Sequence, residues 1–198
     1  VSYIKWDMNR MLSDAGSSFL PPDRQGEIWH RHILGVYEIQ EQLLALFPNL
    51  IIENCASGGA RFDPGMLYYS PQIWCSDNMD PVDRARIHEG TAMLYPLSAI
   101  GSHVSKSPGD ITGRTSSFRT RGITAMFGCF GYELDITGLT GDEKSQISRQ
   151  IDRYKELRPL FFEGDYYCLH PIGEKDRYQV LEIVSKDKQR GCIFFFQA

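Results

Sequence analysis

Short apolar runs alternate with longer segments of helical periodicity along most of the chain. Runs typical of buried strands occur at residues 1–7, 50–55, 71–75, 97–104 and 128–136. Between the first two runs, apolar residues recur with helical spacing from Glu27 to Phe47. Strands that alternate with helices predict βα units, whose strands lie parallel in an α/β fold.

Several of the predicted helices carry start signals. Asp80 precedes a proline and is expected to cap the helix that follows. Thr140 and Glu143 have the spacing of a capping box at the start of a long helix. A shorter helix between the fourth and fifth strands is expected to be capped by Thr115 or Ser116.

The pattern changes after Gly164. The strand-like runs 166–170, 178–185 and 191–197 are joined by charged turns, with no helical segment between them. Such a pattern predicts an antiparallel meander. We therefore expect a domain boundary near Gly164, with residues 1–163 in an α/β domain and residues 164–198 in a small antiparallel β segment.

The composition narrows the classes of protein to consider. With 42% apolar and 23% charged residues, the chain is ordinary for a globular protein, and its 198 residues fall short of the about 250 of a complete (β/α)8 barrel. The net charge of -4, without a basic stripe, argues against nucleic acid as a partner, and no apolar run suggests membrane insertion. Because the sequence begins without Met or a signal-peptide pattern, we expect a fragment of a longer protein.

The five cysteines are widely spaced, and no two of them form a CxxC pair. They are Cys55, Cys75, Cys129, Cys168 and Cys192. An odd number of isolated cysteines fits free thiols in a reducing compartment better than disulfides or a zinc site. We therefore expect a cytoplasmic protein with no metal site and no cofactor.

Polar residues lie at the ends of the predicted strands. These strand ends are Asp7, Cys55, Asp77, His103 and Asp135. In a parallel barrel such ends converge on the face that holds active sites. Two facing carboxylates suit glycoside hydrolysis, in which one attacks the anomeric carbon and the other protonates the leaving oxygen. A separation of about 5–5.5 Å between the carboxyl groups would mean retention of configuration.

The neighbours of Asp7 and Asp77 predict different roles for the two carboxylates. Lys5 lies two residues before Asp7, on the same side of the strand, and its charge should keep Asp7 ionised, as a nucleophile requires. Asp77 has no adjacent cation, and a drier setting near Trp74 would favour the protonated form that an acid catalyst needs.

Plainer interpretations of the same residues stay open. Asp7 could be a buried acid paired with Lys5 or Arg10, and Asp77 could be only a helix-start residue. Cys55 could be an inert core thiol. We expect His103 to be a structural, hydrogen-bonded histidine rather than a catalyst.

Several motifs follow one another in the chain. They are Lys5-Trp6-Asp7-Met8-Asn9-Arg10, Glu53-Asn54-Cys55-Ala56-Ser57-Gly58-Gly59-Ala60-Arg61-Phe62-Asp63 and Trp74-Cys75-Ser76-Asp77-Asn78, extended by Gly101-Ser102-His103-Val104-Ser105 and Thr112-Gly113-Arg114. Together and in this order they resemble the α-galactosidases of glycoside hydrolase family 36. The resemblance covers roughly the whole chain.

The resemblance implies a retaining hydrolase that forms a covalent galactosyl-enzyme. Asp7 matches the family's nucleophile at the end of the fourth barrel strand, and Asp77 matches the acid/base at the end of the sixth. The substrate-binding residues that it implies are Lys5, Cys55, Gly58 and Trp74. The implied fold is a partial TIM (β/α)8 barrel, about strands 4–8 in residues 1–163, followed by the start of a carboxyl-terminal β-domain.

The chain departs from the family's pattern in two ways. Ala60 stands where a third glycine is expected, which should matter little. The aspartates, tryptophan and arginine of the earlier strands have no counterpart, so about half of the galactose pocket is missing. We therefore expect that the isolated chain could be inactive, and that its first strand is an unpaired edge favouring a homo-oligomer.

Two kinds of function are compatible with these features. The first is an α-galactosidase that hydrolyses terminal α-galactosyl residues of melibiose- or raffinose-type sugars. A close variant is a galactosyltransferase of the raffinose- or stachyose-synthase kind, in which a sugar hydroxyl replaces water. The second is a non-catalytic partial-barrel module. A metal-dependent hydrolase is disfavoured, because no ligand spacing for a metal appears.

Overall fold

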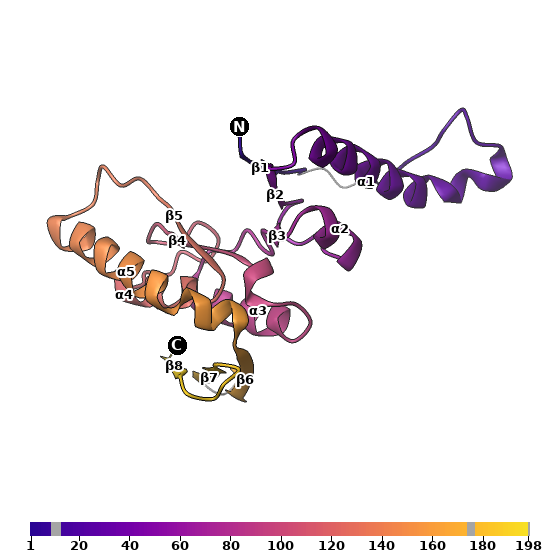
Figure 1. The fold of residues 1–198 in the computed structure, drawn as a ribbon. Helices are drawn as coiled ribbons and strands as arrows, with labels where there is room; N and C mark the ends of the chain where they lie inside the picture. Colours follow the sequence, from indigo (N-terminus) through magenta and orange to yellow (C-terminus); the bar gives the residue numbers. More distant parts are fainter. Residues whose placement is uncertain (9–12, 174–176, 198) are drawn as a thin grey trace. The chain divides into compact units, whose positions relative to one another are not determined.

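The chain forms an α/β fold with two parallel sheets and a final antiparallel sheet (Figure 1). The structure is a computed structural model and describes residues 1–8, 13–173 and 177–197. It divides into two compact units, Val1–Trp74 and Cys75–Ala198. The predicted succession of parallel strands and an antiparallel meander is confirmed. Asn9 and Arg10 of the first motif lie outside the described residues.

The first unit is built on a parallel sheet in the order β1-β2-β3. Its elements are β1 (Tyr3–Trp6), η1 (Pro22–Glu27), α1 (Ile28–Leu46), β2 (Ile51–Asn54), α2 (Pro64–Tyr69) and β3 (Gln72–Ile73). The register pairs Trp6 with Asn54 and Asn54 with Ile73. The carboxyl ends of the three strands therefore lie side by side, and β1 is an edge strand of this sheet.

The short helix α2 is absent from the sequence-based expectation. Asp63 caps it by accepting a hydrogen bond from the backbone N–H of Met66 at 3.0 Å, and Pro64 occupies its first position. Tyr37 of α1 donates a second hydrogen bond to the Asp63 carboxylate at 2.8 Å. The cap therefore also links α2 to α1, a tertiary contact that the local pattern does not reveal.

The second unit holds the remaining two sheets. Its elements are α3 (Pro81–Ala92), η2 (Leu97–Ala99), β4 (Gly101–Ser105), α4 (Phe118–Ala125), β5 (Cys129–Glu133), α5 (Gly141–Glu163), β6 (Asp165–His170), β7 (Tyr178–Val184) and β8 (Gly191–Gln197). Strands β4 and β5 are parallel, whereas β6, β7 and β8 form an antiparallel sheet in chain order.

Of the three helix caps predicted for this unit, two are confirmed by the structure. Asp80 caps α3, and Thr140 forms the predicted capping box with Glu143 at the start of α5. The expectation for α4 was wrong, because its cap is Ser117, whose hydroxyl accepts from the backbone N–H of Thr120 at 3.0 Å. Consecutive Thr and Ser residues precede α4, and local sequence does not distinguish among them.

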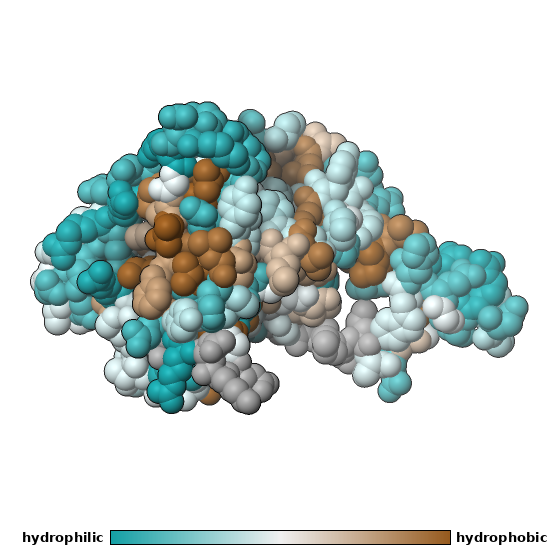
Figure 2. Space-filling model, turned by 90° about the horizontal axis from the view of Figure 1, so that it is seen from below, coloured by the Kyte–Doolittle hydropathy of each residue, from teal (hydrophilic) through white to brown (hydrophobic). Residues whose placement is uncertain are grey.

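An apolar core joins α5 to the antiparallel sheet. Leu157 and Phe161 of α5 pack in one cluster with Leu181 and Ile183 of β7 and Phe194 of β8. The alternation along β8 turns Phe194 and Phe196 inward and leaves Ile193 and Phe195 more than half exposed. Exposed apolar surface of this kind appears as brown patches in Figure 2. No helix among the described residues is long and apolar enough to span a membrane.

His88 on α3 is 2% exposed and lies against a small cavity lined by residues of α4, β7 and β8. Burial lowers the pKa of His88 well below its ordinary value, and the charge of Arg84 lowers it further. The unfolded chain therefore binds a proton at this position at a higher pH than the folded chain does. The free energy of unfolding should decrease as the pH falls below about 6.5.

We expect His88→Gln to weaken this pH dependence. The folded wild-type chain should lose up to about 1.4 kcal/mol of stability per pH unit below pH ~6.5 from this group. Urea unfolding between pH 5 and pH 7 measures the slope. His30→Gln, on an exposed position of α1, is the control. Equal slopes in wild type and His88→Gln would contradict the prediction.

Candidate active site

Asp7 and Cys55 follow β1 and β2 directly, and these strands are neighbours in one parallel sheet. The backbone N–H of Cys55 donates to the carbonyl oxygen of Trp6 at 2.9 Å, which continues the strand pairing by one residue. Asp7 is exposed, and its carboxylate accepts from the backbone N–H of Met8 at 2.7 Å. The sheet therefore presents the carboxylate to solvent while fixing the backbone that carries it.

The Cys55 thiol is a hydrogen-bond donor to Asp7. Cys55 is 1% exposed, and its burial, followed by the hydrogen bond to the Asp7 carboxylate, raises the pKa of Cys55 to about 11. The thiol is therefore neutral at pH 7, and the carboxylate is the acceptor. In this pair the carboxylate, rather than the sulfur, is the group equipped for nucleophilic attack. All five cysteines are free thiols.

Lys5 and Trp74 form a cation–π contact. The Lys5 Nζ atom lies 4.6 Å from the centroid of the Trp74 ring, and Trp74 follows β3 directly. The backbone N–H of Trp74 continues the sheet by donating to the carbonyl of Asn54 at 2.9 Å. Both residues are thus held at the carboxyl ends of the strands. The predicted effect of Lys5 on the ionisation of Asp7 stays a prediction.

A tight turn after β2 explains the glycine at position 58. Ser57 and Gly58 have φ angles of 48° and 78°, a backbone conformation that favours glycine. The turn closes with a hydrogen bond from the N–H of Ala56 to the carbonyl of Gly58 at 3.0 Å. The backbone of Gly58 also hydrogen-bonds to Cys55, so the turn and the buried thiol support each other.

Arg61 is a site residue to which sequence reasoning assigned no role. It is 7% exposed, and its Nη2 donates to the carbonyl oxygens of Trp6 at 3.1 Å and Cys55 at 2.6 Å. The buried amide of Asn54 donates in turn to the carbonyl of Arg61. Burial lowers the pKa of Arg61, and a guanidinium remains charged at neutral pH even so.

Asp77 belongs to the second unit and is exposed. It borders a cavity of about 160 Å³, whose other charged lining residues include Lys106, Asp110 and Glu133. Lys106 and Asp110 form an ion pair at 2.7 Å. The drier setting near Trp74 that the sequence predicts for Asp77 stays a prediction.

Arg84 reaches from α3 to the peptide before Asp77. It is 2% exposed, and its Nη1 donates to the carbonyl of Ser76 at 3.1 Å. Its Nη2 donates to the carbonyl of Gly101 in β4 at 3.1 Å. Burial lowers the pKa of Arg84, whereas the charges of Cys75 and Asp77 act in the opposite direction. The guanidinium thus joins the segment that carries Asp77 to a parallel strand.

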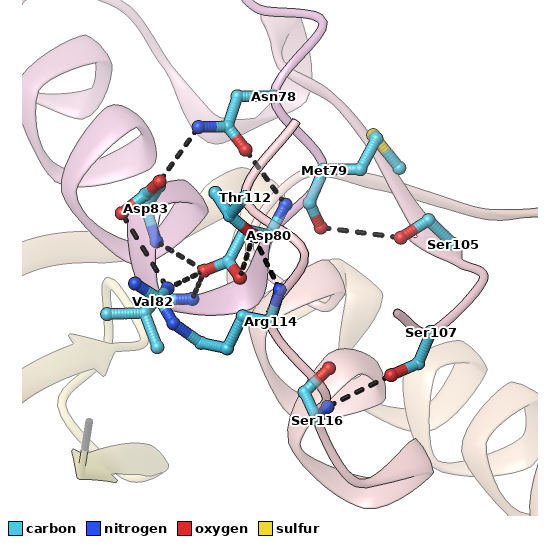
Figure 3. Close-up of polar contacts among 10 residues, drawn as sticks. All are labelled: Asn78, Met79, Asp80, Val82, Asp83, Ser105, Ser107, Thr112, Arg114 and Ser116. Atoms are coloured by element: carbon cyan, nitrogen blue, oxygen red, sulfur yellow. Dashed lines mark hydrogen bonds and ion pairs between the residues drawn. The ribbon is translucent and has the colours of Figure 1, made fainter. Parts of the chain in front are cut away.

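Asp80 anchors the segment between Asp77 and α3 (Figure 3). Its Oδ1 accepts from the backbone N–H groups of Val82 at 2.9 Å and Asp83 at 3.2 Å. The Thr112 hydroxyl donates to Oδ2 at 2.9 Å, and Arg114 donates to Oδ1. Asp80 is 2% exposed, and its buried charge is compensated by these hydrogen bonds from the start of α3 and from the loop that follows β4.

Asn78 completes this network. Its side-chain oxygen accepts from the N–H of Asp80 at 3.1 Å, and its amide donates to the Asp83 carboxylate at 2.8 Å (Figure 3). The Ser105 hydroxyl donates to the carbonyl of Met79 at 3.4 Å. The residues after Asp77 are therefore held by α3 on one side and by the 105–114 loop on the other.

We expect Arg114→Met to destabilise this network. Removing one partner of a buried ion pair lowers the free energy of unfolding by about 3–5 kcal/mol. For Arg114→Met we expect a decrease of only about 1–2 kcal/mol, because the Arg114 side chain is 44% exposed. Lys106→Met breaks the exposed pair with Asp110 in the same loop and should cost less than about 1 kcal/mol. Urea unfolding measures both variants, and equal losses would argue against the buried network.

His103 lies in β4, next to the parallel strand β5. The Nδ1 atom of His103 lies 3.0 Å from the Glu133 carboxylate on the neighbouring strand, as expected for a hydrogen-bonded structural histidine. The described residues contain no grouping of three His, Cys, Asp or Glu side chains suited to a metal ion. The sequence did not single out Glu133, because its pairing with His103 depends on the register of β4 and β5.

Comparisons with known proteins point to one family. A model of the melibiase family matches residues 1–164 of the chain. The α-galactosidase AgaA of Geobacillus stearothermophilus is 46% identical over 197 residues, which span all of this chain and 27% of AgaA. The chain spans about a quarter of the length of the curated relatives it matches.

Solved structures agree with the sequence comparison. The crystal structure of the GH36 α-galactosidase AgaA matches with a TM-score of 0.95 at 46% identity, covering 100% of this chain and 27% of AgaA. A crystal structure of an AgaA variant from the same organism in complex with raffinose matches with a TM-score of 0.96 at 45% identity and the same coverage. The resemblance to family 36 α-galactosidases predicted from the motifs is confirmed.

Proposed function

The chain belongs to the melibiase family, and we propose that it supplies both catalytic carboxylates of a retaining α-galactosidase. The observation that carries the proposal is Asp7 at the carboxyl end of β1, exposed and accepting a hydrogen bond from the buried, neutral Cys55 thiol. A fixed, solvent-facing carboxylate is the group that a covalent glycosyl transfer requires.

In the proposed mechanism Asp7 attacks the anomeric carbon of a terminal α-galactosyl group. Asp77 protonates the glycosidic oxygen as the bond breaks, so that the leaving sugar departs neutral. Asp77 then takes a proton from water, which attacks the galactosyl ester of Asp7 and releases galactose. Two inversions give net retention, and this requires the two carboxyl groups to lie about 5–5.5 Å apart.

The substrate-binding residues complete the proposal. Lys5 binds galactose hydroxyls at the carboxyl end of β1, and Cys55 and Gly58 form the wall of the sugar pocket after β2. Trp74 supports Lys5 through the contact of its ring with the ammonium group. Raffinose, the ligand of the related AgaA variant, represents the proposed substrate class of α-galactosyl oligosaccharides.

The proposed architecture is a partial TIM (β/α)8 barrel. Strands β1 to β5 correspond to barrel strands 4–8, and residues 164–198 begin the carboxyl-terminal β-domain. We further propose a homo-oligomer in a reducing compartment. The exposed apolar side chains of β8 support the first point, and five free cysteines support the second.

A hybrid enzyme tests the proposed function. In this hybrid, the whole 198-residue chain replaces the segment of AgaA that it matches. We expect the folded hybrid to hydrolyse melibiose and raffinose. A hybrid that folds cooperatively and binds 1-deoxygalactonojirimycin, yet shows no turnover where AgaA is active, would favour the non-catalytic module. Product analysis with added sucrose separates the transferase, which would pass galactose to the sugar rather than to water.

A further inference from the structure

Each proposed catalytic aspartate follows a peptide carbonyl that is bound by a buried arginine. Arg61 donates to the carbonyl of Trp6, which directly precedes Asp7. Arg84 donates to the carbonyl of Ser76, which directly precedes Asp77. The two arginines come from different segments and different units of the structure. The same local arrangement thus occurs twice, once behind each carboxylate.

Both guanidinium groups also bind a second carbonyl on a neighbouring strand or at its end. Arg61 donates to the carbonyl of Cys55, which follows β2, at 2.6 Å. Arg84 donates to the carbonyl of Gly101, the first residue of β4, at 3.1 Å. Each arginine therefore ties the peptide before an aspartate to an adjacent, hydrogen-bonded part of the fold.

This geometry restrains the aspartates themselves. The bound carbonyl and the backbone nitrogen of the aspartate belong to the same planar peptide group. A hydrogen bond that fixes this peptide plane therefore also fixes one end of the aspartate backbone. A guanidinium is planar and rigid, which makes it better suited than an ammonium to hold two carbonyls at once. Arg61 is 7% exposed and Arg84 is 2% exposed, so water competes little for these hydrogen bonds.

The two arginines also place positive charge behind the carboxylates. The charge of Asp7 acts on Arg61, and the charge of Asp77 acts on Arg84. Burying a guanidinium has a considerable desolvation cost. A purely structural link between strands could use neutral amide groups, as Asn54 does when it donates to the carbonyl of Arg61.

We propose that Arg61 and Arg84 are positioning residues, Arg61 for the nucleophile Asp7 and Arg84 for the acid/base Asp77. This inference rests on the proposed function. Arg61 sets the direction from which Asp7 approaches the anomeric carbon. Arg84 sets the reach of Asp77 toward the glycosidic oxygen. The two residues therefore affect different steps of the reaction, and this difference makes the inference testable.

The test compares Arg61→Lys and Arg84→Lys in the hybrid enzyme through two quantities that do not depend on the folded fraction. One is the first-order rate constant of covalent labelling by a saturating fluorinated galactosyl fluoride, which requires nucleophilic attack but little proton donation. The other is the ratio of kcat/KM for melibiose to kcat/KM for a dinitrophenyl α-galactoside, which reports on protonation of the leaving group.

We expect Arg61→Lys to lower the labelling rate constant about tenfold and leave the ratio unchanged. Arg84→Lys should lower the ratio about tenfold, a part of the roughly 10²–10⁴-fold that acid–base catalysis contributes, and leave labelling unchanged. Arg121→Lys is the matched control. Arg121 is a buried arginine that donates to the carbonyl of Ser105, which precedes no catalytic residue, so both quantities should stay at the unsubstituted level.

The inference is overturned if the lysine variants match Arg121→Lys, or if each of them changes both quantities alike. Arg61→Gln and Arg84→Gln provide second variants that keep hydrogen-bond donors but remove the charge. Asp77→Ala separates this inference from the proposed function. If Asp77→Ala fails to lower the ratio, the acid/base assignment is wrong; if it does so while Arg84→Lys does not, only the positioning role is wrong.

Discussion

Asp7→Gly is expected to lower the kcat/KM of the hybrid for melibiose by more than about 10⁴-fold, because it removes the group that forms the covalent intermediate. The backbone should be little disturbed, since Asp7 is exposed and the neighbouring Trp6 carbonyl keeps its two hydrogen bonds from Cys55 and Arg61. Steady-state kinetics with melibiose and with an aryl α-galactoside measure the loss.

Azide distinguishes loss of the nucleophile from loss of folding. In Asp7→Gly the small anion can occupy the space of the carboxylate and attack an activated aryl galactoside. A single displacement gives the β-galactosyl azide, with inverted configuration. Asp14→Gly, at an exposed carboxylate in the same unit, is the control and should retain full activity. Azide rescue that yields the α-product, or no rescue in a folded variant, would argue against Asp7 as nucleophile.

Asp77→Ala is expected to lower kcat/KM for melibiose by about 10²–10⁴-fold, because the sugar leaving group then departs without a proton. A dinitrophenyl galactoside needs little protonation, so its first step should be much less affected. Hydrolysis of the galactosyl-enzyme should also slow, since no base activates water. Pre-steady-state kinetics should therefore show a burst of released phenol in this variant.

The configuration of the product that azide forms in Asp77→Ala identifies the role of Asp77. Azide in Asp77→Ala attacks the galactosyl-enzyme from the side that Asp77 faced, and the product is the α-galactosyl azide, with retained configuration. Asp135→Ala removes another exposed carboxylate of the same unit, one that follows β5, and should behave as the unsubstituted hybrid. Equal losses for melibiose and the dinitrophenyl substrate in Asp77→Ala would contradict an acid/base role.

The elements that the sequence predicts correctly are those with strong local signals. The cap of α3 at Asp80 and the capping box of α5 at Thr140 and Glu143 each depend on residues within one turn. The antiparallel strands β6 to β8 follow from alternation and charged turns. In contrast, α2 has only 6 residues and is too short to show an amphipathic period, so its cap at Asp63 is recognised only in the structure.

The sequence predicts only part of the candidate site, because the contacts that support it join residues far apart in the chain. Strand-end position left Asp7 and Asp77 as two acids among several. Their neighbours Lys5 and Trp74 suggested separate roles, and the family resemblance strengthened that assignment. The supporting contacts depend on pairings far apart in the chain. Arg61 meets Trp6 across 55 positions, and no local pattern in the glycine-rich turn indicates this contact. Asp80 shows the same limit: its cap is local, but its bond to Arg114 spans 34 positions.

Trapping the covalent intermediate tests the central claim most directly. The hybrid is labelled with a fluorinated galactosyl fluoride, digested with trypsin and analysed by mass spectrometry. Cleavage after Lys5 and Arg10 releases the peptide 6–10, in which Asp7 is the only carboxylic side chain. We predict that this peptide carries the galactosyl label in one-to-one ratio with lost activity. A label on any other carboxylate, or inactivation without a label on this peptide, would contradict the assignment of Asp7 as nucleophile.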